Sequence, residues 1–436
     1  MTESILIITI YMTPYTPSWG ACQRIYFLSE YLQNMGLNVF VISLKHKVYN
    51  DFGKQISFSS IPIECKYFPM QNKMISVNND PNNNYIKVKT VEYSMKIIKK
   101  LGISLERIFY NEINPSQGIL GMLFLKDAKA DIREIIRAHN IKKAIISGPP
   151  FSLFSITKFL KTNFKDFKVI LDYRDPWNLW EQGSFISFYK EKANLHLADQ
   201  VVFINERLRD DTIQQFGLDK VKCHVVFNGY SDTDWQNVIN KYVNDNLNRD
   251  KLIISYIGSI SFKEGGYRDL SVFWSAISKF KYLDELVIRF IGVDISDKTN
   301  KLKDLFGESV EFIPKVSYER SLHSMLDSDV LLLVHTNKYS AKYILTGKFF
   351  DYARSGKVIL GIADSTETYF LDLIKDYHLG ITSLNTEDHI LKALNLIYHK
   401  WHIDKLHELR KTPNEGLEIF SRDVQNQKYY EILHNI

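Results

Sequence analysis

The sequence predicts an α/β protein with two doubly wound parallel sheets, one in each half of the chain. Three observations favour this fold class. At 436 residues the chain is too long for one typical hydrophobic core and suggests two or three domains. Near-continuous apolar runs such as 4–10 and 252–257 are typical of strands buried on both faces of a parallel sheet. Strand-like and helix-like segments also alternate in both halves, as in repeated βαβ units.

The first strand–helix–strand unit lies at the N-terminus. Residues 4–10 predict its first strand, and 13–20 predict a loop that contains Pro and Gly. Apolar residues then recur at spacings of three and four, which indicates a helix that ends at Gly36. Residues 37–44 are the next predicted strand. Because such crossovers are right-handed, the two strands are expected to be parallel.

The rest of the first half contains the same kinds of segment after a less regular stretch over 50–125. Within that stretch the Asn-rich run at 78–84 predicts a turn or loop. The remaining predicted elements are a helix at 127–139, a strand at 143–147, a break at Pro149-Pro150 with a helix after it, a strand at 169–173, and a strand, helix and strand at 201–204, 206–216 and 224–227.

The polar stretch 231–250 is the predicted linker, because the alternation of strands and helices restarts after it. The predicted elements of the second half are strands at 252–257, 286–291, 329–334 and 357–361, and helices at 268–280, 317–327, 347–356, 386–400 and 415–434. Neither half carries G-x-G-x-x-G after its first strand, which argues against an NAD-linked dehydrogenase.

Composition indicates a soluble globular protein, with 45% hydrophobic and 24% charged residues. Three widely separated cysteines argue against a disulfide framework or a zinc site and fit a reducing compartment. The N-terminus has no signal-peptide pattern, and no apolar run is long enough to span a bilayer. The expected location is therefore the cytoplasm.

Positive charge is concentrated in the front of the chain. Residues 1–180 contain 23 Lys and Arg against 14 Asp and Glu, whereas the remainder contains 32 against 36. A basic front half suits an anionic membrane, a phosphorylated acceptor or nucleic acid. Plain solvated surface explains the charge equally well. Nucleic acid is disfavoured because no binding motif accompanies the charge.

The stretch T-G-K-F-F-D-Y-A-R-S-G-K-V-I-L-G (346–361) is the most informative motif. It predicts a loop that turns at Gly347 into a short helix, followed by a strand. The first amides of a helix are available to an anion, and Lys348 adds positive charge at the same end. Asp351 follows one turn later, so the pattern suits a nucleoside diphosphate, with phosphate at the helix end and ribose at the carboxylate. An ordinary capped helix is the alternative.

Further small or charged residues follow the predicted strands, at the sheet edge where open α/β sheets bind ligands. They are Gly20 with Arg24, Gly148-Pro149-Pro150, Asp172 to Trp177, Gly258-Ser259, and Lys263 with Arg268. Together they favour a ligand cleft between two domains.

At these motifs the chain resembles glycosyltransferases of the GT-B fold, close to the retaining family 4, over nearly its whole length. P-Y-T-P-S-W-G-A-C-Q-R resembles the family's glycine-rich first loop and helix. S-G-P-P-F-S and L-D-Y-R-D-P-W resemble paired motifs of a bacterial surface-polysaccharide branch. T-G-K-F-F-D-Y-A-R-S-G-K resembles the donor-site helix.

The resemblance implies two Rossmann-like domains facing a cleft, with acceptor binding in 1–230 and nucleotide-sugar binding in 231–414. The helix in 415–436 is expected to pack back on the first domain. The implied activity is that of a hexosyltransferase-type enzyme in surface-polysaccharide biosynthesis. It moves a sugar from a nucleoside-diphosphate donor substrate to a glycan or lipid-linked acceptor, with retention and without a metal or other cofactor. The basic domain would then lie peripherally at the inner face of the cytoplasmic membrane.

The same resemblance assigns expected roles to individual residues. The expected catalytic residues are Asp175, Lys263 and Lys348. The expected donor-binding residues are Gly20, Ser259, Arg268, Thr346, Gly347, Lys348 and Asp351. The expected acceptor-side residues are Arg24, Pro150, Arg174 and Asp175. Cations and helix amides would neutralise the leaving diphosphate, and front-face attack would need no protein nucleophile.

Three features depart from the family pattern. Tyr343 stands where the first of two glutamates is usual, and Asp351 replaces the second. Ser259 stands in place of an arginine, for which Arg268 is a substitute, and Phe151 stands in place of a histidine. Two alternatives therefore stay open: a non-catalytic nucleotide-sugar-binding subunit that supports a partner transferase, and a nucleotide-sugar 2-epimerase of the same fold.

Overall fold

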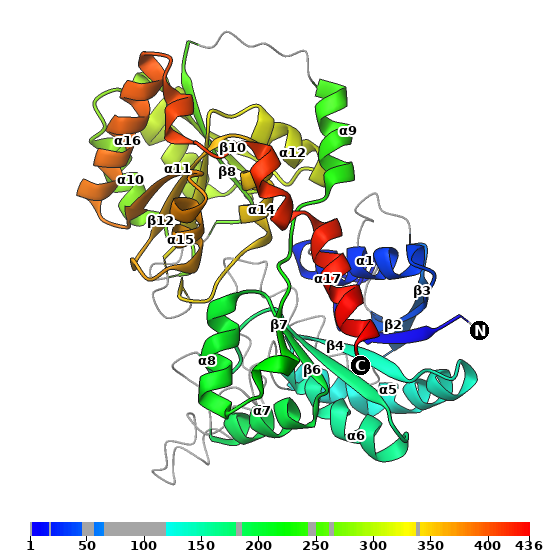
Figure 1. Cartoon of the computed structure of the whole chain (residues 1–436). Helices are drawn as coiled ribbons and strands as arrows, with labels where there is room; N and C mark the ends of the chain where they lie inside the picture. Colours follow the sequence, from blue (N-terminus) through cyan, green and yellow to red (C-terminus); the bar gives the residue numbers. More distant parts are fainter. Residues whose placement is uncertain are drawn as a thin grey trace. The chain divides into compact units, whose positions relative to one another are not determined.

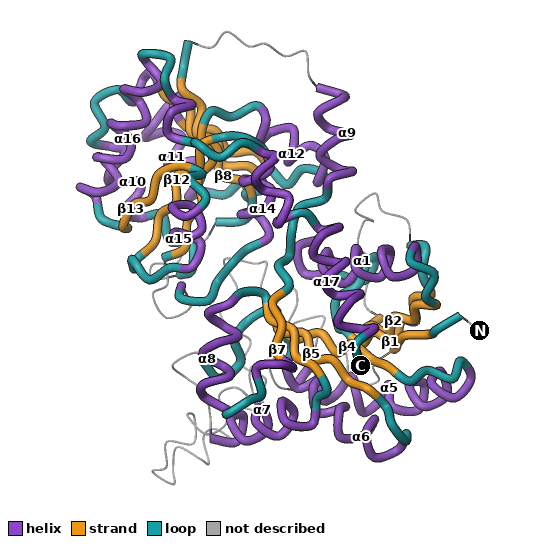
Figure 2. Tube along the Cα trace, viewed as in Figure 1, coloured by secondary structure: helices purple, strands orange, loops and turns teal. Residues whose placement is uncertain are grey.

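The computed structural model describes residues 2–16, 19–45, 56–64, 119–179, 185–242, 250–260, 266–336 and 341–436. By their contacts the residues divide into unit 1, Met1–Val226 with Lys428–Ile436, and unit 2, Phe227–Gln427. Each unit holds one parallel sheet covered by helices (Figures 1 and 2). The predicted fold class of two doubly wound α/β sheets is confirmed. The limits 1–230 and 231–414 stay predictions.

The sheet of unit 1 has seven parallel strands in the order β3-β2-β1-β4-β5-β6-β7. They are β1 (Ser4–Ile8), β2 (Asn38–Lys45), β3 (Ser59–Glu64), β4 (Lys143–Gly148), β5 (Lys168–Tyr173), β6 (Gln200–Phe203) and β7 (Cys223–Val225). The chain runs from β1 outward to β3 and then returns to place β4 beside β1. The strand order therefore reverses between β1 and β4, and open sheets bind ligands at such a point.

Helices cover both faces of this sheet. They are α1 (Trp19–Asn34), α5 (Ile119–Ala138), η2 (Phe151–Ser155), α6 (Ile156–Asn163), α7 (Phe185–Leu197), α8 (Glu206–Phe216) and η3 (Lys220–Lys222). Because right-handed crossovers run in opposite directions on either side of β1, α1 lies on one face and α5 to α8 lie on the other (Figure 1). The end of α17 (Arg422–His434) lies on the face of α1, where Lys143 donates a hydrogen bond to the Leu433 carbonyl.

The sheet of unit 2 has six parallel strands in the order β10-β9-β8-β11-β12-β13. They are β8 (Leu252–Ile257), β9 (Leu286–Ile291), β10 (Val310–Ile313), β11 (Val330–His335), β12 (Val358–Ala363) and β13 (Gly380–Leu384). The helices are α9 (Asp232–Tyr242), α10 (Ser271–Ser278), η4 (Leu283–Glu285), α11 (Asp297–Phe306), η5 (Gly307–Ser309), α12 (Tyr318–Leu326), α14 (Gly347–Arg354), α15 (Tyr369–Asp376), α16 (Glu387–His402), η6 (Leu406–Leu409) and η7 (Asn414–Phe420). The order reverses between β8 and β11, so β8 ends at this unit's ligand edge.

Some sequence-based expectations differ from the structure. The polar stretch 231–250, predicted as a linker, contains α9, whose Trp235 is fully buried. The helix predicted at 415–434 is interrupted at Ser421, which has extended backbone between η7 and α17. The Asn-rich run at 78–84 lies outside the described residues. Among the helices that the structure does describe, none is both long and apolar enough to cross a bilayer.

Candidate functional site

Lys348 connects the first turn of α14 to the end of β8. Its Nζ donates a hydrogen bond of 3.0 Å to the Tyr256 hydroxyl and lies 4.1 Å from the centre of that ring. Gly258 follows β8 with a φ of +123°, and a Cβ at this position would lie 2.4 Å from Lys348 Nζ. The positive φ favours glycine here, and a larger residue would also push the flexible end of Lys348 aside.

Arg268 brings a second cation to the end of β8. Its Nη1 donates to the Ser259 carbonyl at 3.0 Å and to Ser259 Oγ at 2.7 Å. The Tyr256 hydroxyl donates to the same carbonyl at 2.8 Å. The structure thus brings together the predicted residues Ser259, Arg268 and Lys348. They meet around Tyr256, which the sequence reasoning missed, although an aromatic residue two positions before Gly258 was a visible signal.

The two cations have no acidic counter-ion. No described acid forms an ion pair with Lys348 or Arg268, and burial together with Arg268 lowers the pKa of Lys348 well below its ordinary value. Burial, together with the charge of Arg268, lowers the pKa of His335 to about 4, so this neighbour is a neutral imidazole at pH 7. A bound anion would supply the missing negative charge and restore the ordinary pKa of Lys348.

The N-terminus of α14 adds uncharged donors at the same place. Within the described residues, the backbone N–H groups of Gly347 and Lys348 donate to no acceptor. Thr346 precedes the helix without capping it, and its buried Oγ1 has no hydrogen-bond partner. These unsatisfied groups carry the positive end of the helix dipole. Thr346, Gly347 and Lys348 therefore form one predicted cluster that the structure keeps together.

Asp351 points away from this cluster. Its Oδ1 accepts hydrogen bonds from the Tyr318 hydroxyl at 3.0 Å and from Trp235 Nε1 at 3.3 Å. The side chain is buried, which raises its pKa to about 6, while Arg422 and the two hydrogen bonds oppose that rise. The carboxylate thus joins α9, α12 and α14. Its expected ribose contact stays a prediction, and Tyr343, at the position of the missing glutamate, is also buried.

In unit 1 the predicted Arg24 forms a buried ion pair. Its Nε and Nη2 donate to the Asp172 carboxylate, with Nη2 at 2.8 Å, and Nη1 donates to the Val226 carbonyl at 2.9 Å. Ser147 Oγ donates to the other carboxylate oxygen at 2.7 Å. These bonds tie α1, β4 and β5 together. Gly20 is exposed one turn earlier in α1.

The guanidinium of Arg174 also donates its hydrogen bonds within the protein, to backbone carbonyls. It donates to Ala21 at 2.5 Å, to Gly148 at 3.1 Å and to Pro149 at 2.9 Å. Pro150, which follows Pro149, precedes η2 and ends the loop after β4. Arg174 therefore holds two loops of the ligand edge in place.

Unlike Arg24 and Arg174, Asp175 has no hydrogen-bond partner for its side chain among the described residues. The half-buried carboxyl follows β5, and no described residue donates to it or pairs with it. Burial raises its pKa to about 6, although Arg174 acts in the opposite direction. Burial raises the pKa of nearby Tyr11; the charge of Arg174 opposes this rise, and the charge of Asp175 adds to it. Asp175 is thus a carboxyl group at the ligand edge that is available to a ligand.

Behind Asp175, a buried glutamate holds the same loop. Glu191 in α7 accepts hydrogen bonds from the backbone N–H of Asn178 at 3.1 Å and from its Nδ2 at 2.6 Å. Burial raises the pKa of Glu191 to about 8, against the effect of these donors. Glu191 therefore supports the loop in its protonated form at neutral pH.

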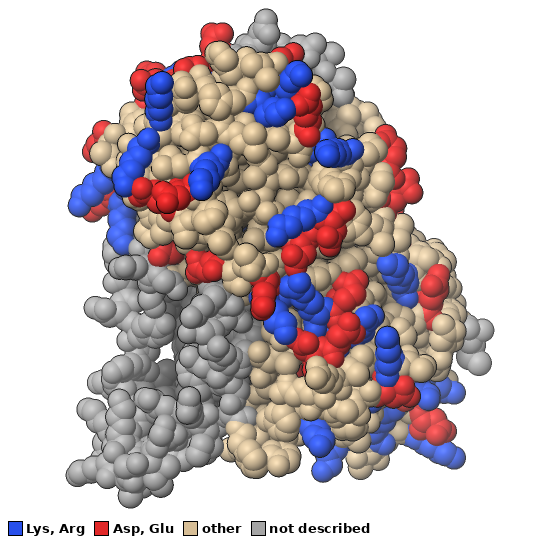
Figure 3. Space-filling view, turned by 60° about the vertical axis from the view of Figure 1, so that its left-hand side comes forward, with Lys and Arg blue, Asp and Glu red and all other residues tan. Residues whose placement is uncertain are grey.

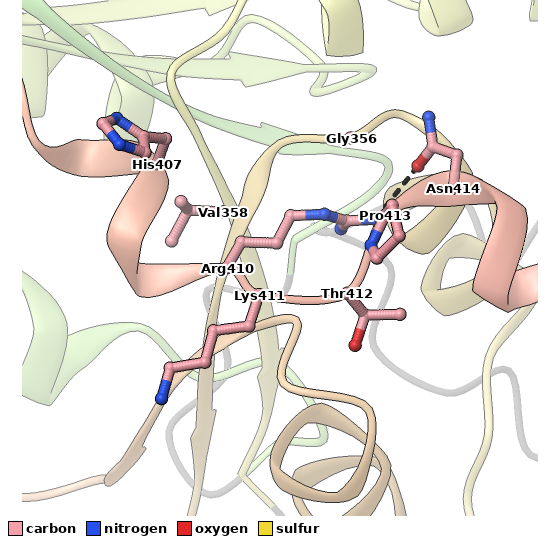
Figure 4. A pocket seen from close by; sticks show the side chains of 8 residues that line it. All are labelled: Gly356, Val358, His407, Arg410, Lys411, Thr412, Pro413 and Asn414. Carbon is pink, nitrogen blue, oxygen red and sulfur yellow. Dashed lines mark hydrogen bonds between the residues drawn. The ribbon is translucent and has the colours of Figure 1, made fainter.

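Other candidate positions add no second centre. Lys263 lies outside the described residues. In the described ranges no three His, Cys, Asp or Glu side chains gather as a metal would require. A hollow of about 330 Å³ lies beside Gly356 (Figure 4). There Arg410 donates to the Ala353 carbonyl and to Asn414, which closes the C-terminus of α14, the end opposite Lys348.

No protein-family model matches the sequence, and no curated protein matches it. Solved structures do match. Sucrose-phosphate synthase from Thermosynechococcus elongatus has a TM-score of 0.67 at 13% identity, covering 99% of this chain and 98% of that one. A glycosyltransferase from Rickettsia africae has a TM-score of 0.61 at 15% identity, covering all of both chains.

The fold is GT-B. The GT-B neighbours also include UDP-GlcNAc 2-epimerase from Neisseria meningitidis bound to UDP-GlcNAc, with a TM-score of 0.58 at 10% identity over all of both chains. At these identities the likeness concerns the fold alone, and the GT-B fold serves both transferases and epimerases. The predicted GT-B fold is confirmed, whereas family 4 and the surface-polysaccharide branch stay predictions.

Proposed function

We propose that the protein is a metal-independent glycosyltransferase that moves a sugar from a nucleoside-diphosphate donor to a glycan or lipid-linked acceptor. One observation carries the proposal: among the described residues, Lys348 and Arg268 have no acidic partners and lie beside the unsatisfied donors at the start of α14. A diphosphate is the anion that needs several donors and two positive charges in one place. The neighbours of the same fold make a nucleotide sugar the natural source of that diphosphate.

In this proposal Lys348 and the amides of Gly347 and Lys348 stabilise the negative charge that grows on the leaving diphosphate. Such charge stabilisation is the main contribution a transferase of this kind makes to the rate. Arg268, held by Ser259, provides the second charge. Asp175 accepts a hydrogen bond from the acceptor hydroxyl and orients it for front-face attack. The bond between the anomeric carbon and the diphosphate breaks as the glycosidic bond forms with retention of configuration, and the leaving phosphate takes the hydroxyl proton.

A nucleotide-sugar 2-epimerase is the second candidate, because a solved epimerase shares the fold. A non-catalytic binding subunit is the third, because Asp351 is already occupied by Trp235 and Tyr318. A thermal-shift screen of nucleoside diphosphates and their sugars, beginning with the uridine series, tests the shared step, since a ligand of the native state raises its stability.

The fate of the bound donor then separates the three. A transferase releases nucleoside diphosphate slowly in water, an epimerase changes the configuration at C2 of the sugar, and a binding subunit leaves the donor unchanged. Absence of any stabilising nucleotide would reject the proposal itself.

A further inference from the structure

The helices α5, α6 and α7 lie on one face of the sheet of unit 1 (Figure 1). α6 contacts α7, and Lys129 and Arg133 of α5 lie over the Phe159 ring of α6 at 5.7 and 5.3 Å. The three helices therefore form a continuous layer. We name a set of its exposed cationic and aromatic residues the α5–α7 surface: Lys126, Lys129, Arg133, Arg137, Lys158, Phe185, Tyr189, Lys190 and Lys192.

On α5 the cations of this surface are separated from the acids of the same helix. The four cations of α5 are three or four residues apart, so they share one stripe of the helix, on the side of Phe159. The acids of α5, at 127, 131 and 134, lie on another stripe, roughly 100° further around the helix. The one acid in α6 and α7 is Glu191, which is buried. By contrast, acidic and basic groups are interspersed on the face drawn in Figure 3.

Two aromatic side chains extend from one end of the same surface. Phe185 and Tyr189 are 70% and 53% exposed, and their rings pack edge to face with centres 4.4 Å apart. Lys190 and Lys192 follow on the same helix. Exposed aromatic rings next to lysines are suited to a membrane interface, where the rings enter the headgroup region and the cations meet lipid phosphates.

We propose that the α5–α7 surface binds the anionic headgroups of a lipid bilayer, with Phe185 and Tyr189 inserted at its boundary. A bilayer is the occupant that satisfies both features, since it offers extended negative charge to the cationic stripe and an apolar boundary to the rings. Because the donor cluster is in unit 2, this binding is independent of the proposed transfer reaction. Membrane binding would bring the protein to the bilayer in which a lipid-linked acceptor lies.

The test uses the full chain and co-sedimentation with vesicles of phosphatidylglycerol and phosphatidylcholine, compared with phosphatidylcholine alone. Lys129→Gln, Arg133→Gln and Arg137→Gln are combined in one variant. The matched control combines Lys301→Gln, Lys375→Gln and Lys392→Gln, exposed lysines of unit 2, and so removes the same charge elsewhere. Each cation near an anionic surface is worth about fivefold in partitioning, so the first variant, which lacks three, should lose roughly 100-fold. The control should lose little.

A second variant separates the apolar contribution from the electrostatic one. Salt screens charge, so any binding that survives high salt comes from the rings. Phe185→Ser combined with Tyr189→Ser should remove the binding that survives high salt. Equal partitioning of the two charge variants, or equal binding to anionic and neutral vesicles, would overturn the proposal. So would binding of RNA or heparin without vesicle binding, and thermal unfolding of each variant verifies that it is folded.

Discussion

Replacing Lys348 by methionine tests the donor cluster most selectively. Methionine keeps the length and packing of the side chain and removes its charge and its hydrogen bonds. Among the described residues Lys348 Nζ has only the Tyr256 hydroxyl and ring as partners, so we expect little folding stability to depend on it. A hydrogen bond to a charged group contributes about 1.5–3 kcal/mol. The Kd for the nucleoside diphosphate should therefore rise by roughly 10- to 150-fold.

Isothermal titration calorimetry measures this loss and a second, independent consequence. Because burial holds the pKa of Lys348 well below its ordinary value, a bound diphosphate should raise that pKa and draw a proton from the buffer. The observed enthalpy should then depend on the ionisation enthalpy of the buffer, increasingly so as the pH rises toward the ordinary lysine pKa. Lys392→Ala, at an exposed site on α16, is the control. Unchanged affinity for Lys348→Met would refute the assignment.

Three further predictions concern residues outside this cluster. Asp175 has a pKa of about 6 and acts as a carboxylate, so donor turnover should fall as the pH drops through 6. Asp175→Asn should lower the rate and remove this fall in the pH profile. A fall that persists in the variant would contradict the role. Trp235→Phe removes a donor to Asp351 and should lower the free energy of unfolding by about 1–2 kcal/mol in urea denaturation, whereas no loss would mean that the 3.3 Å contact is not a stabilising bond. The pKa of Glu191 is raised to about 8, so its contribution to stability is complete below the unfolded value near 4.5 and is lost as the pH rises through 8. Glu191→Gln should remove this decline, by up to about 1.4 kcal/mol per pH unit, and equal slopes of stability against pH in both proteins would reject it.

The sequence predicted the strands better than the sites. Buried parallel strands such as 252–257 and 286–291 are continuous apolar runs, so their limits match the structure. The cluster at Thr346, Gly347 and Lys348 was also predictable, because a helix start is a local feature of the chain.

Contacts between distant segments were not predictable from local patterns. Arg24 and Arg174 follow strands at the ligand edge, and their positions suggested ligand binding. In the structure Asp172 and four backbone carbonyls accept their hydrogen bonds. Asp351 stands at the expected position, but its carboxylate already accepts hydrogen bonds from Tyr318 and from Trp235, which lies 116 residues earlier. Whether a polar side chain is available to a ligand depends on its tertiary partners, which no spacing reveals.

The central claim is that this chain binds a nucleoside-diphosphate sugar at the start of α14 and transfers the sugar. NMR of the chain incubated with a panel of nucleotide sugars tests it most directly, through the phosphorus signals of the nucleotide and the anomeric proton of the sugar. The claim predicts that one donor is cleaved to nucleoside diphosphate and free sugar, and that Lys348→Met slows the cleavage. An intact donor with an inverted C2, or no change in any donor, would contradict it.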